Sequence, residues 1–239
     1  MRDWETIFPE YDRQIYEKAG YKGKQGFGQR PALLIIDVIT SFTGTKPMET
    51  LAAIDEFRSS CGNAAWQALP HIRKLLMACR KTKVPVIYST SDPDFKAVFG
   101  NATKREREPT TMSDLAVKFP QTIHPRKDEY VVHKARASAF FGTHLTTYLT
   151  RKNVDSLIVT GCSTSGCVRS TVIDGYSHGF SVFVVEEGTF DRSPFSHLVN
   201  LYEMNSKYAT VVTRSEALAH VESLQTVPQL EVAKHQRAR

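Results

Sequence analysis

The stretch VDSLIVTGCSTSGCVRSTVIDGYSHGF, from Val154 to Phe180, contains the pattern that decides the fold. Its first eight residues, Val154–Gly161, are mostly apolar and favour a buried strand. A loop rich in Gly, Ser and Thr follows. The residues from about Ser165 to His178 then have the pattern of a helix, which Gly179 ends. We therefore predict a strand–loop–helix unit here, with two cysteines in its loop.

The same alternation of strand and helix runs through the rest of the chain. Strands are predicted at residues 31–37, 84–90, 129–134, 154–161, 180–187 and 208–213, and helices at 63–83, 142–153, 165–178 and 194–207. Pro70 predicts a kink or a new start in the first of these helices. Such alternation is typical of a doubly wound, Rossmann-like α/β fold. We expect a three-layer sandwich around a six-stranded, mainly parallel sheet.

The length of 239 residues is compatible with a single domain. We expect a catalytic core at residues 31–215, an N-terminal extension at 1–30 and a C-terminal tail at 216–239. The start of the extension is compatible with a helix that packs on a neighbouring subunit. Residues 92–125 have little periodicity, and we expect them to form a long loop that carries specificity.

Composition favours a soluble protein, since 41% of the residues are apolar and 23% are charged. The longest apolar run is too short to span a membrane, and the N-terminus lacks the pattern of a signal peptide. Four cysteines are too few for a disulfide scaffold, so we expect reduced thiols in the cytoplasm. The net charge of +6 comes from short clusters without interleaved aromatics. That pattern argues against nucleic acid and favours small anionic substrates.

Cys162 and Cys167 have several possible roles. A redox pair usually has the spacing C-x-x-C, and here four residues intervene. A zinc site would need further Cys or His at short spacing, and none lies nearby. Both residues are also compatible with a role as small core residues, because free cysteine is often buried.

Position distinguishes the two thiols. With Ser165 as N-cap and Gly166 as the first helical residue, Cys167 falls in the first turn of the predicted helix. Unpaired N–H groups and the helix dipole favour a thiolate there. Cys162 lies in the loop, outside this field. We therefore expect Cys167 to be a nucleophile.

A thiol nucleophile needs a proton acceptor and an electropositive partner. Asp37 and Lys134 end two predicted strands, and the carboxyl ends of parallel strands lie at one edge of the sheet. His133 should point to the opposite face of its strand from Lys134. The alternative for Asp37 and Lys134 is a buried ion pair with a structural role.

Several of these motifs resemble one family. PALLIID, KARASAFFGT, LIVTGCSTSGCVRST and FDRSP, in this order between about residues 26 and 212, resemble the cysteine hydrolases of the isochorismatase-like superfamily. Within it, the branch of the N-carbamoylsarcosine amidohydrolases is the most similar. The resemblance implies an isochorismatase-like hydrolase fold, a mechanism without metal or other cofactor, and a homo-oligomer (a tetramer or a dimer).

The resemblance also implies site residues. It assigns a catalytic triad to Asp37, Lys134 and Cys167. It implies a cis peptide bond between Cys162 and Ser163, with the backbone amides of Ser163 and Cys167 as the oxyanion hole. Arg192 would bind a substrate carboxylate.

Two further residues are candidates for the substrate pocket, and the motifs also depart from the family pattern. Phe42 and Thr164 are the candidates. Where many members have DMQNDF, this chain has DVITSF, and STSDPDF lacks the histidine with which nicotinamidases bind a metal.

We therefore expect a cysteine-dependent amidohydrolase that cleaves a primary amide or ureido group of a small substrate with a carboxylate. The reaction would release ammonia through a thioester. Alternatives are a maleamate or ureidoacrylate amidase, an amidase for a neutral amide such as nicotinamide or biuret, and a catalytically silent binding protein of the same fold.

Overall fold

The computed structural model describes residues 2–21, 23–92 and 115–224. Its sheet consists of β1 (Pro31–Ile36), β2 (Val86–Ser91), β3 (Tyr130–Lys134), β4 (Ser156–Cys162), β5 (Ser181–Phe190) and β6 (Thr210–Val212). The strand order is β3-β2-β1-β4-β5-β6, and all neighbours are parallel. The prediction of a doubly wound, six-stranded sheet is confirmed.

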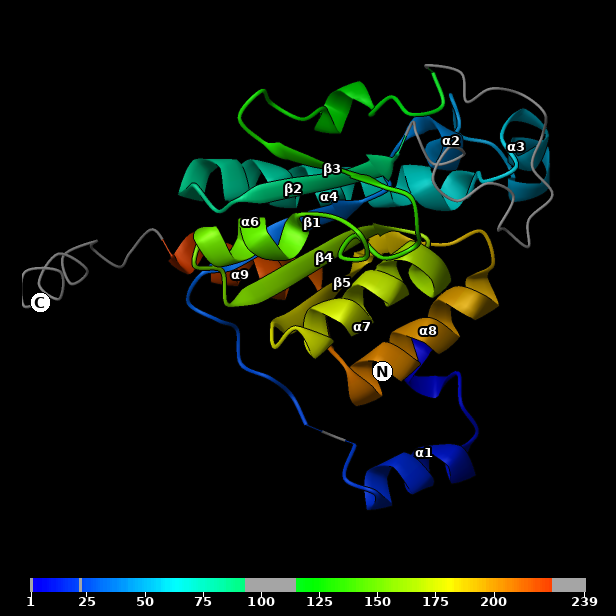
Figure 1. Ribbon diagram of the computed structural model, residues 1–239. Coiled ribbons are helices and arrows are strands. Elements are labelled where there is room, and N and C mark those ends of the chain that lie inside the picture. The colour runs from blue at the N-terminus through cyan, green and yellow to red at the C-terminus, as the bar shows by residue number, and fades with distance from the viewer. Residues whose placement is uncertain (1, 22, 93–114, 225–239) are drawn as a thin grey trace, which may run out of the picture.

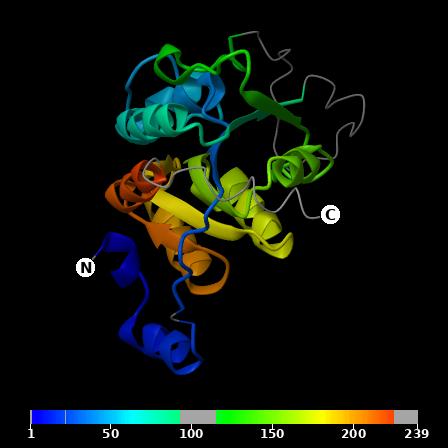
Figure 2. The same cartoon turned by 90° about the vertical axis from the view of Figure 1, so that its left-hand side faces the viewer.

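Helices cover both faces of the sheet, as Figures 1 and 2 show. One face carries α4 (Asn63–Thr82) and α9 (Arg214–Ser223), and the other carries α6 (Leu145–Arg151), α7 (Arg169–Ser177) and α8 (Pro194–Lys207). The other helical segments of the described residues are η1 (Asp3–Thr6), α1 (Glu10–Lys18), α2 (Thr40–Thr43), α3 (Thr50–Glu56), η2 (Gln121–Ile123) and η3 (Thr164–Val168). Among the described helices, none is long and apolar enough to cross a membrane.

The apolar run of β1 divides between the two cores because successive side chains of a strand point to opposite faces. Leu33 and Ile35 pack on the side of α4, whereas Leu34 and Ile36 pack on the side of α7 and α8. All four are at most 1% exposed. Burying a side chain of this size contributes about 1.5–3 kcal/mol, so this central strand fixes the sandwich.

Two local predictions differ from the structure. Of the two alternatives at Pro70, a kink or a new start, the new start is excluded, because α4 is one helix from Asn63 to Thr82 that includes it. The predicted C-terminal tail begins inside α9, which packs on α4 with Ala217 and Val221 fully buried. The sandwich therefore extends past residue 215. Residues 225–239, and residues 93–114 of the predicted specificity loop, lie outside the described residues.

The N-terminal extension consists of η1 and α1. Trp4 in η1 is buried, and its Nε1 donates to Glu186 Oε2 of β5 at 2.7 Å. Helix α1 lies apart from the sandwich in Figure 1, although Tyr16 donates a hydrogen bond to Glu203 of α8. No residue of α1 is buried.

Strand order reverses between β1 and β4, whose connections leave in opposite directions. In open α/β sheets a crevice forms at such a point, outside the carboxyl ends of the strands. Asp37 follows β1, and the loop with Ser163 follows β4. The topology therefore brings the predicted site residues to the switch point.

Candidate active site

Asp37 is held in place directly after β1. Its backbone has a φ of 50°, in the left-handed region that non-glycine residues seldom adopt. The Ser89 hydroxyl donates to Asp37 Oδ1 at 2.6 Å, and the Asp37 amide donates back to Ser89 Oγ at 3.1 Å. Ser89 comes from the neighbouring strand β2. The carboxylate is only 3% exposed, so its orientation is fixed by these contacts.

Lys134 joins the other two predicted catalytic residues. Its Nζ lies 2.7 Å from Asp37 Oδ2 and donates to Cys167 Sγ at 3.4 Å and to the Arg136 carbonyl at 3.1 Å. These contacts use all three donors of the ammonium group. Burial lowers the pKa of Lys134, but Asp37 and Cys167 outweigh it and hold the pKa above its usual value. Lys134 is therefore a fixed positive charge.

Cys167 lies in η3, a turn of π-helix directly before α7. Burial and the Asp37 carboxylate raise the pKa of its thiol to about 12, although Lys134 lowers it. Burial and Asp37 both oppose the thiolate that the helix start was expected to favour. The helical turn also starts earlier than predicted, with Ser163 rather than Ser165 as its N-cap.

The loop before this turn contains the other cysteine. The peptide bond between Cys162 and Ser163 is cis. Cys162 is fully buried, its Sγ contacts the Asp37 carbonyl at 3.3 Å, and burial raises the pKa of its thiol. The Ser163 carbonyl accepts from the amides of Gly166 and Val168. The assignment of the Ser163 and Cys167 amides to an oxyanion hole stays a prediction.

The three predicted substrate residues have different surroundings. Arg192 follows β5, and its Nη2 donates to the Ser59 carbonyl at 2.9 Å, while its buried Nε has no partner. Phe42 is half-buried in α2 and packs against the core on the α4 side. Thr164 is fully buried, and its hydroxyl lies 2.7 Å from His197 Nδ1. The structure thus leaves Arg192 and Phe42 partly exposed but not Thr164.

Three functional candidates escaped the sequence analysis: Ser89, Asp191 and His197. Ser89 is a polar residue within a buried strand, which is a usable signal. Asp191 is 4% exposed and contacts the cysteine turn, and it stands in the quoted motif FDRSP. His197 lies within α8, and burial lowers its pKa. The sequence gives no signal that His197 would face Thr164.

His133 is exposed on the face opposite Lys134, as predicted.

The arrangement brings together a thiol, a carboxylate that can accept its proton, and a fixed ammonium. Such a set suits nucleophilic attack on a carbonyl carbon. Within the described residues, no group of three or more His, Cys, Asp and Glu side chains is arranged to hold a metal ion.

Comparison with known proteins gives one family. The model of the isochorismatase domain matches residues 31–216. Maleamate amidohydrolase of Pseudomonas putida is 31% identical over 205 residues, which cover 83% of this chain and 90% of that enzyme. N-carbamoylsarcosine amidase of Arthrobacter is 30% identical over 235 residues, covering 93% and 81%. The crystal structure of a cysteine hydrolase from Pseudomonas syringae shares the fold, with a TM-score of 0.70 and 21% identity over 84% of this chain and 97% of that one.

These findings confirm the predicted resemblance. They also confirm the prediction of a hydrolase for carbon–nitrogen bonds of linear amides, because both relatives are amidohydrolases. The domain match begins at the first residue of β1 and ends in α9, so it includes every strand of the described sheet. It also includes Lys134 and the two side chains that its Nζ contacts, Asp37 and Cys167. This chain belongs to the isochorismatase family.

Proposed function

We propose that this protein is a cysteine-dependent amidohydrolase that removes ammonia from the terminal carbamoyl group of a small carboxylic acid. The observation that carries the proposal is the buried cluster in which Lys134 Nζ contacts both Asp37 Oδ2 and Cys167 Sγ. Nucleophile, base and cation are thereby held within hydrogen-bond reach of one another. The relationship to two amidohydrolases supports the same chemistry.

Acylation begins from the neutral thiol, since the raised pKa of Cys167 leaves little thiolate at neutral pH. Asp37 accepts the thiol proton while Sγ attacks the amide carbonyl carbon. Lys134 stabilises the negative charge that develops on sulfur. The carbon–nitrogen bond then breaks as protonated Asp37 returns its proton to the leaving nitrogen. Ammonia departs and a thioester to Cys167 remains.

Deacylation uses the same groups in reverse. Asp37, again a carboxylate, takes a proton from a water molecule that attacks the thioester carbonyl. The carbon–sulfur bond breaks, and Cys167 recovers its proton from Asp37. The product is a carboxylic acid, or a carbamic acid that loses carbon dioxide when the substrate is a ureido compound. Ser89 keeps the carboxylate oriented through both halves by its hydrogen bond to Oδ1.

The substrate class follows from what the relatives share. Maleamate and N-carbamoylsarcosine, which give two relatives their names, both combine a terminal carbamoyl group with a carboxylate. The identities of 31% and 30% favour neither. Arg192 supplies a partly exposed guanidinium with a free buried Nε for such a carboxylate.

An ammonia-release assay tests this proposal. The panel contains maleamate, N-carbamoylsarcosine, ureidoacrylate, nicotinamide and biuret. The methyl ester of maleamate, which keeps the amide but lacks the charge, is the matched control. We expect ammonia release from at least one of the acids, slower release from the methyl ester, and none with Cys167→Ala. Equal rates for acid and ester would remove the carboxylate requirement. Turnover of nicotinamide or biuret alone would favour the neutral-amide alternative.

We also propose that the protein works as a homo-oligomer in the cytoplasm. Helix α1 and the turn after it expose apolar side chains, with Tyr11 72%, Ile15 48% and Tyr21 50% exposed. Exposed apolar groups of this kind favour an interface. Light scattering should give a dimer or tetramer for the full chain, and Ile15→Asp together with Tyr11→Asp should shift it toward the monomer. A monomeric wild-type protein would contradict this proposal.

A further inference from the structure

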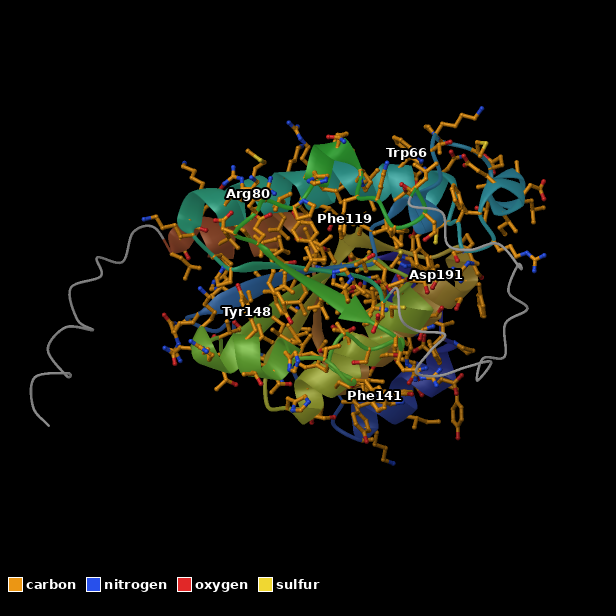
Figure 3. All side chains as sticks on the ribbon, turned by 45° about the horizontal axis from the view of Figure 1, so that its top comes forward. Trp66, Arg80, Phe119, Phe141, Tyr148 and Asp191 are labelled. Atoms are coloured by element: carbon orange, nitrogen blue, oxygen red, sulfur yellow. The ribbon has the colours of Figure 1, made fainter. Side chains whose placement is uncertain are left out.

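One buried carboxylate outside the catalytic cluster contacts the nucleophile's turn. Asp191 follows β5 and is 4% exposed. Its Oδ2 accepts from the Ser165 amide at 2.8 Å and from the Ser165 hydroxyl at 2.6 Å. Its Oδ1 accepts from the Arg192 amide at 2.8 Å. In Figure 3 Asp191 lies toward the end to which the green arrow of β3 points.

Asp191 contacts the first turn of η3, where the first backbone amides have no hydrogen-bond acceptor within the turn. Ser163, the N-cap of η3, makes no side-chain capping hydrogen bond. The first amides of a helical segment have no acceptor within it, and a carboxylate is favoured at that end. Asp191 therefore caps the turn from another part of the chain. Ser165 lies two residues before Cys167, so this cap acts on the segment that carries the thiol.

A second contact comes from the same side. Thr164, the residue before Ser165, is paired with His197 of α8 at 2.7 Å. Both anchors of the turn thus come from the connection between β5 and the first turns of α8. Cys167 Sγ in turn lies 3.4 Å from Lys134 Nζ. An error of about 1 Å at a reacting atom can reduce a rate about 100-fold, so the anchoring of this turn matters for the reaction.

We propose that Asp191 is a positioning residue, which holds the Cys167 turn against Asp37 and Lys134 and links it to the segment that carries Arg192. The inference rests on the proposed function, since it assigns Cys167 as the nucleophile. Asp191 itself touches no reacting atom. Its role is to keep the thiol in the buried place beside Asp37, where its pKa is raised.

The test compares Asp191→Ala and Asp191→Asn with a matched control, Asp155→Asn. Asp155 is also a carboxylate that accepts backbone hydrogen bonds from another segment, the amides of Gln29 and Arg30. It precedes β4, at the opposite end of the strand from Cys162. Two quantities are measured for each variant: kcat in the ammonia-release assay, and the rate at which iodoacetamide alkylates Cys167 between pH 7 and 11.

Loss of Asp191 should lower kcat about 100-fold. It should also shift the pKa seen by alkylation from about 12 toward the ordinary thiol value near 8.5. Asp155→Asn should lower the melting temperature but leave kcat and the alkylation profile unchanged. The inference is overturned if both Asp191 variants keep kcat within about twofold and the wild-type profile, or if Asp155→Asn changes both equally.

The experiment still tests the role of Asp191 if one variant does not fold or if no amide in the panel is hydrolysed. If Asp191→Ala does not fold, the isosteric Asp191→Asn decides, because its amide group cannot accept hydrogen bonds on both sides. Alkylation needs no substrate, so it still tests the anchoring of the turn if no amide is hydrolysed. Turnover retained by Cys167→Ala would instead refute the proposed function.

Discussion

Replacing Asp37 by Asn should change turnover and thiol reactivity in opposite directions. The substitution keeps the shape of the side chain but removes the proton acceptor and the negative charge beside Cys167. Turnover should fall about 10²- to 10⁴-fold, the range associated with losing a general base. The thiol, by contrast, should become more reactive toward an external reagent, because the carboxylate that raises its pKa is gone while Lys134 remains.

The size of the second effect follows from the charges. With a pKa of about 12, roughly one Cys167 in ten thousand is a thiolate at pH 8. A nearby charge shifts a pKa by about 1–3 units, so removing that of Asp37 should raise the thiolate fraction about 10- to 1000-fold. A less basic thiolate is less nucleophilic, with a Brønsted coefficient of about 0.5. Alkylation at pH 8 should therefore accelerate about 3- to 30-fold.

The assay measures iodoacetamide incorporation at Cys167 by peptide mass spectrometry, beside ammonia release from the same preparation. The doubly substituted protein Asp37→Asn, Cys167→Ala is the control, and it should incorporate no label at this peptide. Cys61 and Cys79 are buried and serve as internal references. Slower alkylation in Asp37→Asn would contradict the effect assigned to the Asp37 charge, and retained turnover would exclude Asp37 as the base.

Three further predictions concern other parts of the chain. Ser89→Ala removes a hydrogen bond to a buried carboxylate and should lower the free energy of unfolding by about 1.5–3 kcal/mol in urea titrations; an unchanged midpoint would contradict the contact. Arg192→Met should reduce kcat/KM for a carboxylate substrate about 10-fold or more but leave its methyl ester unaffected, and equal losses on both would remove the assignment. Burial raises the folded-state pKa of the Cys79 thiol to about 12, so its contribution to stability is complete below the unfolded value near 8.5 and is lost as pH rises toward 12. Between pH 9.5 and 11 the free energy of unfolding should fall more steeply in the wild type than in Cys79→Ala, by about 1.4 kcal/mol per pH unit. Equal slopes in the two proteins would contradict the raised pKa of Cys79.

The fold was predictable because its signals are local. Strand β1 is a continuous apolar run, and helix α8 was predicted with the bounds that the structure gives, residues 194–207. Because ligands bind outside the carboxyl ends of parallel strands, Asp37 and Lys134 could be placed together although they are distant in sequence. Their contact of 2.7 Å agrees with that reasoning.

Other features depend on contacts that a sequence pattern does not contain. The pKa of Cys167 is set by burial and by Asp37, which the helix-start argument did not weigh. The π-helical turn begins at Thr164, held by Asp191 and His197 from a segment about thirty residues later. Most of helix α9 was assigned to the C-terminal tail, because its packing against α4 is a tertiary contact that the local sequence pattern does not show. Each of these features depends on contacts between segments that are distant in the sequence.

In the proposed mechanism Cys167 carries the acyl group during turnover. The direct measurement is rapid acid quenching during hydrolysis of a substrate found in the ammonia-release panel, followed by mass spectrometry of the peptide that contains Cys167. We expect the mass of the Cys167 peptide to increase by the mass of the substrate minus that of ammonia. The increase should be absent in Cys167→Ala, which should also release no ammonia. Ammonia release at the wild-type rate by Cys167→Ala, with no adduct on the wild-type cysteine, would contradict this mechanism.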